Sequence, residues 1–232
     1  MPKLHGRHTR VYMDGYDISG DFNSFEPGYA ADVAEVSGFG ASVKSYVVGL
    51  ADPAIRVAGL FNDAANKAHA IATSRIGSEV MLNATWGTDV GKYGVGGTVS
   101  LSEYSISSGI GGPVSSAMSL SGGAGAGVFE FVRTLWGNVQ FQGTADAGFD
   151  TGETPTNAGF SAHLQLIGGS GTAIVQSSTA AAAASVWTDR IDFGSRVAPY
   201  ADYRGTYAGT VPQFLRVIFT GVGTGWLGYK RF

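Results

Sequence analysis

The sequence predicts an all-β protein with one flanking α-helix, and three features of its composition carry this prediction. Glycine accounts for 36 of the 232 residues, roughly double the ordinary usage, without a strict Gly-X-Y period. Hydrophobic residues make up 44% of the chain and aromatic residues 12%, which is ample for a core. Charged residues reach only 14%, far fewer than helical bundles and coiled coils need. We therefore expect a Gly-rich β protein whose weakly charged surface is covered in part by copies of itself or by partners.

In the first half of the chain, short extended segments alternate with turn residues. Residues 9–13 form the first expected strand, and the Asp14-Gly15 dipeptide after it is typical of a two-residue hairpin turn. Further strands are expected at 16–19, 22–26, 54–61, 79–86, 95–107 and 114–121. The segment from Pro27 to Tyr46 shows little strand periodicity, so we expect a long loop, and a loop of that length is usually functional.

One helix is expected, between Asn62 and Gly77. The Asn62-Asp63 pair offers an N-cap, and the residues that follow are rich in alanine. Arg75 falls in the last turn and Gly77 just after it, as at many helix C-termini. The small side chains of this helix allow a close approach to a sheet.

The second half of the chain predicts a β-sandwich. Its expected strands recur at even spacing, at 160–167, 173–177, 186–193, 203–208 and 214–220. The Ala180–Ala184 tract is too short to nucleate a helix alone, so we expect a loop there. A change of composition near 134–140 predicts two domains, at 1–135 and 136–232.

Several protein classes are disfavoured by composition. Fifteen basic and 18 acidic residues give a net charge of −3 without a cationic block, which is not a nucleic-acid-binding signature. The absence of cysteine excludes disulfides and thiolate metal sites. The first residues lack the apolar region of a signal peptide, and no apolar run approaches the length of a membrane span. We expect a soluble protein made in the cytoplasm, with no membrane partner.

No motif predicts catalysis or a cofactor. The four histidines lack zinc-site spacing, and no G-x-S-x-G elbow is present. The Gly-rich stretch 122–127 precedes a β-type run rather than a helix, so it predicts a turn and not a phosphate loop. Asp146, Asp150 and Glu153 miss the calcium-loop pattern. We expect no enzyme, no metal and no cofactor, although a carboxylate pair that meets only in space stays open.

Aromatic residues of the second half allow two interpretations. Trp187, Tyr200, Tyr203 and Tyr207 are suited to a sugar-binding platform, and they are equally suited to the core and edges of a sandwich. We list Trp187, Tyr203 and Tyr207 as candidate surface aromatics of an outer domain.

The order of motifs over residues 8–130 resembles the major tail tube proteins of long-tailed (siphovirus-like) bacteriophages. The matching segments are Val11–Gly20, Ser37–Gly40, Lys44–Tyr46 and Val48–Asp52, followed by the strand from Ile55 and the Ala-rich helix. The second half resembles a β-sandwich module appended to phage virion proteins, on Gly159–Leu164, Val175–Ser178, Val186–Asp189, Phe214–Val217 and Lys230–Phe232. It departs from that module at the Ala180–Ala184 tract.

The resemblance implies a tail-tube β-sandwich or barrel domain that forms hexameric rings, stacked into a tube through which DNA passes without specific binding. It implies partners in the tape measure, tail terminator and distal tail proteins, and a location in the virion tail after synthesis in the host cytoplasm. The loop at 27–53 would reach a neighbouring ring or subunit, with Val33, Val36, Phe39, Lys44, Tyr46 and Val47 as contact residues. The second domain would face outward, where host surface glycans are possible ligands.

Two alternatives belong beside this interpretation. The first is a capsid decoration protein or another phage structural protein built from the same β modules. The second is a carbohydrate-binding module that uses the aromatic residues of the second half.

Overall fold

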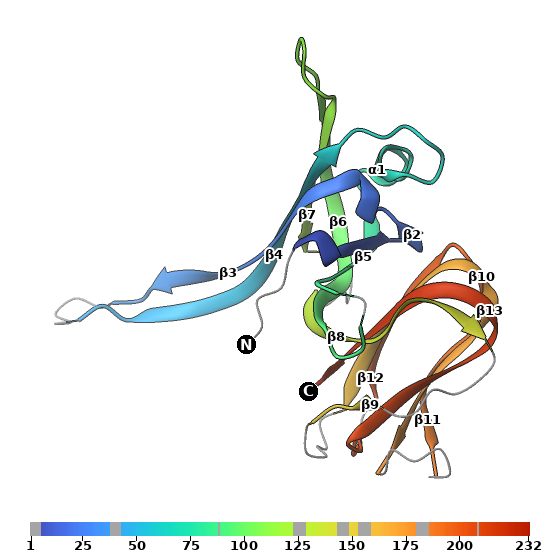
Figure 1. Ribbon diagram of the computed structural model, residues 1–232. Helices are drawn as coiled ribbons and strands as arrows, with labels where there is room; N and C mark the ends of the chain where they lie inside the picture. The colour runs from blue at the N-terminus through green and yellow to red at the C-terminus, as the bar shows by residue number, and fades with distance from the viewer. Residues whose placement is uncertain are drawn as a thin grey trace.

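A computed structural model describes residues 6–37, 43–87, 89–122, 129–142, 149–152, 159–179, 186–207 and 209–232. Within these residues the protein is all-β, with α1 (Ala68–Arg75) as its only α-helix and two single 3-10 turns at Gly6–His8 and Ser19–Asp21. The predicted fold class is therefore confirmed. Every strand pairing is antiparallel, and the strands form one continuous, strongly bent sheet (Figure 1).

The first half of the sheet has the strand order β2-β1-β5-β6-β7-β4-β3. The strands are β1 (Arg10–Met13), β2 (Tyr16–Asp17), β3 (Phe22–Glu35), β4 (Tyr46–Leu60), β5 (Glu79–Thr85), β6 (Tyr93–Ser107) and β7 (Ser115–Gly122). The β1–β2 turn is the predicted one, since Asp14 and Gly15 have φ values of 49° and 83°.

Alternation along β4 and β7 creates the first core. Ile55 and Val57 face Leu120 and Met118 across the β4–β7 ladder and are buried. Three residues of α1, Ala68, Ile71 and Ala72, join the same cluster. Because successive side chains of a strand point to opposite faces, the residues between them form a separate outer face.

The second half is built on two long strands. Its strands are β8 (Glu130–Gln142), β9 (Phe149–Asp150), β10 (Phe160–Ser178), β11 (Thr188–Val197), β12 (Tyr200–Tyr207) and β13 (Phe214–Arg231). The beginning of β10 pairs with β12 and its end pairs with β11, so that β10 and β13 bend from one layer into another around a second core. The expected strands at 160–167 and 173–177 are thus one strand.

Glycine makes this bend possible. Gly169 has a φ of +80°, and a Cβ there would lie 2.0 Å from the carbonyl oxygen of Val222 on β13. Only glycine tolerates both the left-handed backbone and this approach. Part of the high glycine content is therefore explained by the corner of the second half.

The two halves meet along β8. Its residues Glu130–Arg133 pair with β6, and from Arg133 onward it pairs with β13. The predicted division after residue 135 falls inside this strand, and the division into two domains stays a prediction.

Two predictions about local structure were wrong. In the segment from Pro27 to Tyr46, expected as a loop, most of the described residues belong to β3 and Tyr46 begins β4, although residues 38–42 lie outside the described part. The helix begins at Ala68 rather than near Asn62, because Asn62 Oδ1 accepts the Ala64 amide in a local turn and Asn66 adopts a left-handed backbone.

The cap of α1 comes from elsewhere in the chain. Buried Asp21 accepts hydrogen bonds from the Ala68 amide (3.0 Å) and from the Asn62 side-chain amide (2.7 Å). The carboxylate also faces the positive end of the helix. A residue 47 positions away therefore does what Asp63 was expected to do.

Replacing this cap tests the assignment. We expect Asp21→Ala to lower the free energy of unfolding by about 1–3 kcal/mol, because it leaves the buried Ala68 amide and the part-buried Asn62 amide without their acceptor. Asp63→Ala, at the exposed position that the sequence suggested as cap, should change it by less than about 0.5 kcal/mol. Equilibrium denaturation of both variants measures the difference, and equal effects would contradict it.

Candidate functional site

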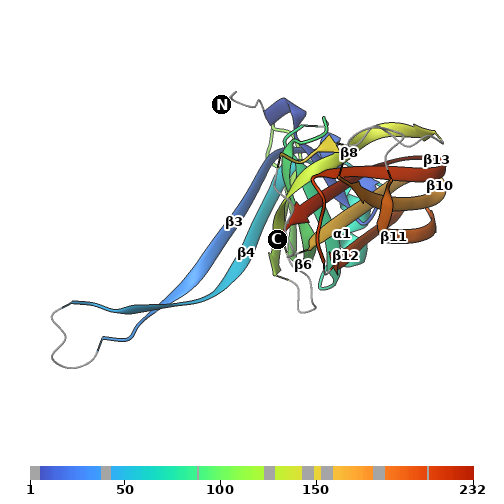
Figure 2. The same ribbon diagram turned by 90° about the horizontal axis from the view of Figure 1, so that it is seen from below.

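The most prominent surface is an arm formed by the far ends of β3 and β4. This hairpin extends well beyond the body of the molecule (Figures 1 and 2). We define the arm as residues 29–37 and 43–53. Along it, Val33, Val36, Tyr46 and Val47 are 54–57% exposed. Glu35 and Lys44 form an exposed ion pair across the hairpin, at 2.9 Å. Phe39 lies outside the described residues.

The arm explains why its strands were not predicted from sequence. Strand periodicity arises when one face is buried and the other is solvated. At its base Tyr29 packs on Phe129, but the described side chains farther out, at 33–37 and 43–47, are exposed, so this part of the sequence has no need to alternate. An isolated two-stranded hairpin is marginally stable in water, and apolar side chains on such an element favour a covering partner.

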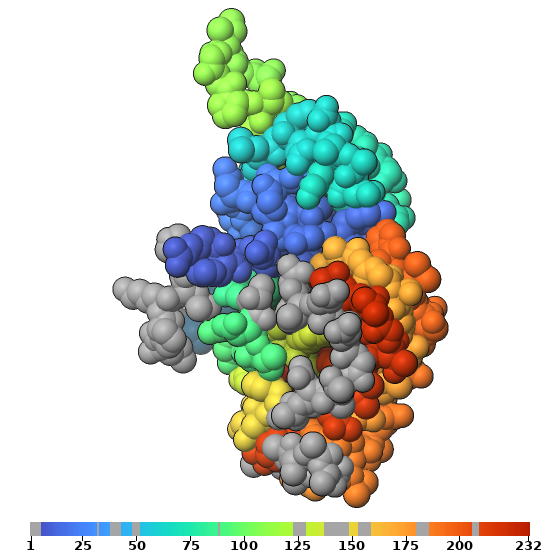
Figure 3. Space-filling view, turned by 45° about the vertical axis from the view of Figure 1, so that its right-hand side comes forward, coloured from blue at the N-terminus to red at the C-terminus, as the bar shows by residue number. Residues whose placement is uncertain are grey.

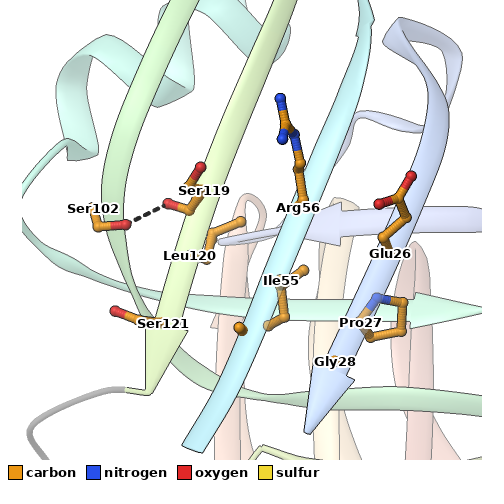
Figure 4. A pocket seen from close by; sticks show the side chains of 10 residues that line it. Glu26, Pro27, Gly28, Ile55, Arg56, Ser102, Ser119, Leu120 and Ser121 are labelled. Carbon is orange, nitrogen blue, oxygen red and sulfur yellow. Dashed lines mark hydrogen bonds between the residues drawn. The ribbon is translucent and has the colours of Figure 1, made fainter. Parts of the chain in front are cut away.

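The second feature is the outer face of the four strands β3, β4, β7 and β6. Small or polar residues dominate this face: Ser24, Glu26, Gly28, Ala54, Arg56, Ala58, Glu103, Ser105, Ala117, Ser119 and Ser121. Figure 4 shows Glu26, Arg56 and Ser119 side by side on neighbouring strands. The hollow there measures about 530 Å³ and is lined by one carboxylate, one guanidinium and three serines. This set lacks the convergent titratable groups of a catalytic pocket.

Both edges of this four-stranded face are open in the described chain. Among the described strands, β3 pairs only with β4, so its other edge is open. Strand β6 pairs with β7 along one edge, and along the other edge its pairing with β5 ends at Ser100. Residues Ser102–Ser107 of β6 therefore have no strand partner on that second edge. Unpaired strand edges are templates for pairing with another chain.

A second projection lies at the tip of the β6–β7 hairpin, which stands out from the body in Figure 3. It carries the exposed side chains of Ile106, Ile110 and Val114. Two projections with exposed apolar residues and two open edges are features of a subunit that assembles.

The structure does not bring the candidate aromatics of the second half together. The Arg216 guanidinium carbon lies 4.1 Å from the centroid of the Trp187 ring, just before β11 begins. Tyr203 packs on His163, near the beginning of β10. Trp187 directly precedes Thr188, which pairs with Ser177 near the end of β10, 14 residues from His163. The side chain of Tyr207 is outside the described part. Trp187 and Tyr203 therefore do not share one platform.

A buried polar cluster was missed by sequence reasoning. Glu130 Oε1 accepts hydrogen bonds from Ser161 Oγ (2.5 Å) and His163 Nε2 (2.9 Å), and Lys230 Nζ lies 3.0 Å from Oε2. Ser161, His163 and Glu130 are at most 3% exposed. The serine bonds to the carboxylate rather than to the histidine, so the cluster lacks the serine–histidine hydrogen bond that activates a nucleophile.

The described residues contain no group of three His, Cys, Asp or Glu side chains able to hold a metal ion. Asp150 accepts hydrogen bonds from the Gly152 amide and the Gln213 side chain, which lower its pKa, whereas Asp146 and Glu153 lie outside the described residues. Among the described segments, none of the helical ones is long and apolar enough to span a bilayer.

Comparisons with known proteins give only distant likenesses. No protein-family model and no curated protein matches the chain. A chain from the tail of an empty gene transfer agent particle, refined with C6 symmetry, has a TM-score of 0.42 and 16% identity, over 55% of this chain and 99% of that one. The virion of the native gene transfer agent particle gives a TM-score of 0.41 with the same identity and coverage.

The crystal structure of the SPP1 Dit protein, described as a paradigm of the hub adsorption apparatus in phages that infect Gram-positive bacteria, gives a TM-score of 0.36. The identity is 9%, over 97% of this chain and 99% of that one. These TM-scores are too low to assign the chain to any of these proteins.

The arm should be the least protected described strand pair of the monomer. In hydrogen exchange of unassembled protein, we expect the amides of residues 33–35 and 46–47 to exchange at least a hundredfold faster than the amides of β10 facing β13. The reason is that opening the arm exposes no core. Equal protection of the two regions would contradict this picture.

Proposed function

We propose that this chain is a structural virion protein, the major tail tube subunit of a long-tailed bacteriophage, which forms stacked hexameric rings around a channel for DNA. One observation carries the proposal: a four-stranded antiparallel sheet with two open edges and an outer face of mostly small residues. The resemblance of residues 8–130 to tail tube proteins adds to it.

The direction of the strands suits ring closure. Three antiparallel pairings separate β6 from β3, so these two edge strands run in opposite directions. The β6 edge of one copy therefore pairs with the β3 edge of the next without breaking the antiparallel pattern. Such a head-to-tail contact closes into a ring when the rotation allows it, and a closed barrel has no free edges.

The outer face has the chemistry of a DNA channel. DNA binding depends mainly on Lys and Arg contacts to phosphates. The face carries one arginine, Arg56, against the carboxylates of Glu26 and Glu103. Serine and alanine occupy most of the rest, so DNA would pass along it without being held.

The arm would cover a neighbouring subunit or ring through Val33, Val36, Phe39, Lys44, Tyr46 and Val47. Residues 1–135 would build the tube, and 136–232 would face outward. The tape measure, tail terminator and distal tail proteins would be its partners in the virion, with no cofactor. Of the aromatics proposed for a glycan-binding role of the outer half, Trp187 is partly exposed and lies under Arg216, and Tyr203 packs on buried His163.

Negative-stain microscopy of concentrated protein tests the proposal directly. We expect hollow rings or tubes. Closed trimers, or a protein that stays monomeric at every concentration, would instead favour a capsid decoration protein or a carbohydrate-binding module. Strong, specific hits on a glycan array would favour the last of these.

Charges on the arm should stop assembly without unfolding the subunit. Burial of each valine contributes about 1.5–3 kcal/mol, so we expect the double variant Val33→Asp, Val47→Asp to need at least about 100-fold more protein to assemble. The thermal midpoint of the monomer should stay within about 2 °C, since both side chains are exposed. Val197→Asp, an exposed valine of β11, is the matched control and should assemble normally. A double variant that assembles like the control would remove the arm from the interface.

The proposed division of labour is tested by truncation. A chain ending at Gln142 keeps all of β8 and the whole four-stranded face, so we expect it to fold and to form rings. Circular dichroism checks the folding and microscopy the rings. A folded truncated chain that stays monomeric would show that residues 143–232 belong to the tube.

A further inference from the structure

The contact between the two halves is polar where a core would be expected. The two large hydrophobic clusters lie on either side of it. Among the described residues, the only apolar cluster between them consists of Tyr12, Val132 and Trp226, with Ile167 beside it. The rest of the contact is a set of buried hydrogen bonds. Gln165, fully buried on β10, accepts from the Gly15 amide and donates to Asn83 Oδ1 and to the Met81 carbonyl.

Next to Gln165, His163 is held by one nitrogen only. Its Nε2 faces the Glu130 carboxylate, which makes Nε2 the donor and leaves Nδ1 as the unprotonated nitrogen of a neutral ring. Nδ1 is buried and has no hydrogen-bond partner, and the same is true of Asn83 Nδ2. A Cβ on Gly96 would lie 3.2 Å from Nδ1 and 2.0 Å from that amide nitrogen, so glycine makes room for both atoms.

A proton on Nδ1 would find no acceptor. Asn83 Oδ1 already accepts from Gln165, which turns the Asn83 amide donor, not its oxygen, toward Gly96. A buried donor without an acceptor costs about 1–3 kcal/mol, and more when it carries charge.

The charges around His163 also favour its neutral form. From β8 it faces Glu130, from β13 Lys230, and from β12 the Tyr203 ring at 4.8 Å, whereas β5 and β6 contribute the uncharged Asn83 and Gly96. With neutral His163, the Glu130 and Lys230 charges balance. A protonated His163 adds a second cation beside the same carboxylate.

The pKa values agree with this balance. Burial lowers the pKa of His163, and the Glu130 hydrogen bond only partly opposes it. Burial raises the pKa of Glu130, but the hydrogen bonds from His163 and Ser161 outweigh it and hold the pKa below its usual value. Near neutral pH the cluster therefore contains a carboxylate, an ammonium and an uncharged imidazole.

We infer that the Glu130–His163–Lys230 cluster is an acid-sensitive latch between the two halves, which holds them together while His163 is neutral and releases them when His163 is protonated. An opened contact exposes His163 to water, where its pKa returns to about 6.5. The open state then binds more protons than the closed one. The latch is complete above about pH 6.5 and weakens as the pH falls toward the lowered pKa of the closed state. This inference does not depend on the proposed function.

The full-length monomer offers two local probes of the latch. The Gly15 amide, which bonds to Gln165 across the contact at 2.6 Å, reports by hydrogen exchange. Trp226, fully buried and stacked on Tyr12, reports by fluorescence. Between pH 7.5 and 5, after correction for intrinsic exchange, we expect at least tenfold faster exchange at Gly15 relative to Val57 in the first core. A reversible change of fluorescence should accompany it, with an unchanged far-ultraviolet spectrum.

The variant His163→Gln keeps a donor toward Glu130 and cannot ionise, so the pH step should vanish. His69→Gln, which alters a half-buried histidine of α1 bound to Tyr104, should retain it. A step that survives in His163→Gln would overturn the latch, as would the absence of a step in the wild type or a step that coincides with loss of the far-ultraviolet signal. If His163→Gln fails to fold, imidazole NMR of the wild type decides: His163 must titrate at the midpoint of the step, and any other midpoint overturns the inference.

Discussion

The backbone ladder of β8 is the interaction on which the rest of the molecule depends. Its first residues complete the sheet of the first half at β6, and its remaining residues complete that of the second half at β13. Backbone donors and acceptors are obligatory, so a strand that serves two sheets couples them more firmly than side-chain contacts do. The relative placement of the two cores, and of everything mounted on them, follows from this one strand.

Around β8 the two halves contact each other mainly through buried, hydrogen-bonded polar side chains rather than through an apolar core. Thr85, Thr134 and Trp226 form one hydrogen-bonded chain there. Separate hydrogen bonds join Gln165 to Asn83 of β5 and His163 to Glu130 of β8. Buried polar groups restrict geometry more tightly than apolar ones, because each needs a partner at a set distance and angle. The halves are thereby held in one arrangement, and the arrangement depends on the protonation of one imidazole.

Away from this contact, the described chain has exposed apolar side chains and unpaired strand edges. The arm, the β6–β7 tip and the open edges of β3 and β6 belong to the first half. In the second half, β11 and β12 are also edge strands, since each pairs only with β10 among the described strands. Exposed apolar side chains and unpaired edges cost stability or solubility in a monomer. The proposed assignment of assembly to the first half rests on its two projections and on the small-residue face between its open edges.

The sequence by itself determined the elements whose signals are local. The Asp14-Gly15 turn, the strands from 79 to 122 and the end of α1 just before Gly77 follow from turn chemistry, alternation and capping between near neighbours. The sequence named Val33, Val36, Tyr46 and Val47 as contact residues of a loop, and the structure places them, exposed, on a hairpin. Their function is a proposal on either view.

Only the tertiary structure decided which face of each strand is buried against what. Along β10, Ser161, His163 and Gln165 alternate with Ala162, Leu164 and Leu166, a pattern that predicts a solvated face, yet both faces are buried because the first half covers the polar one. The cap of α1 by Asp21 and the bridging role of β8 have the same origin. Each joins residues far apart in the chain, and periodicity records how a strand divides its side chains but not what lies against either face.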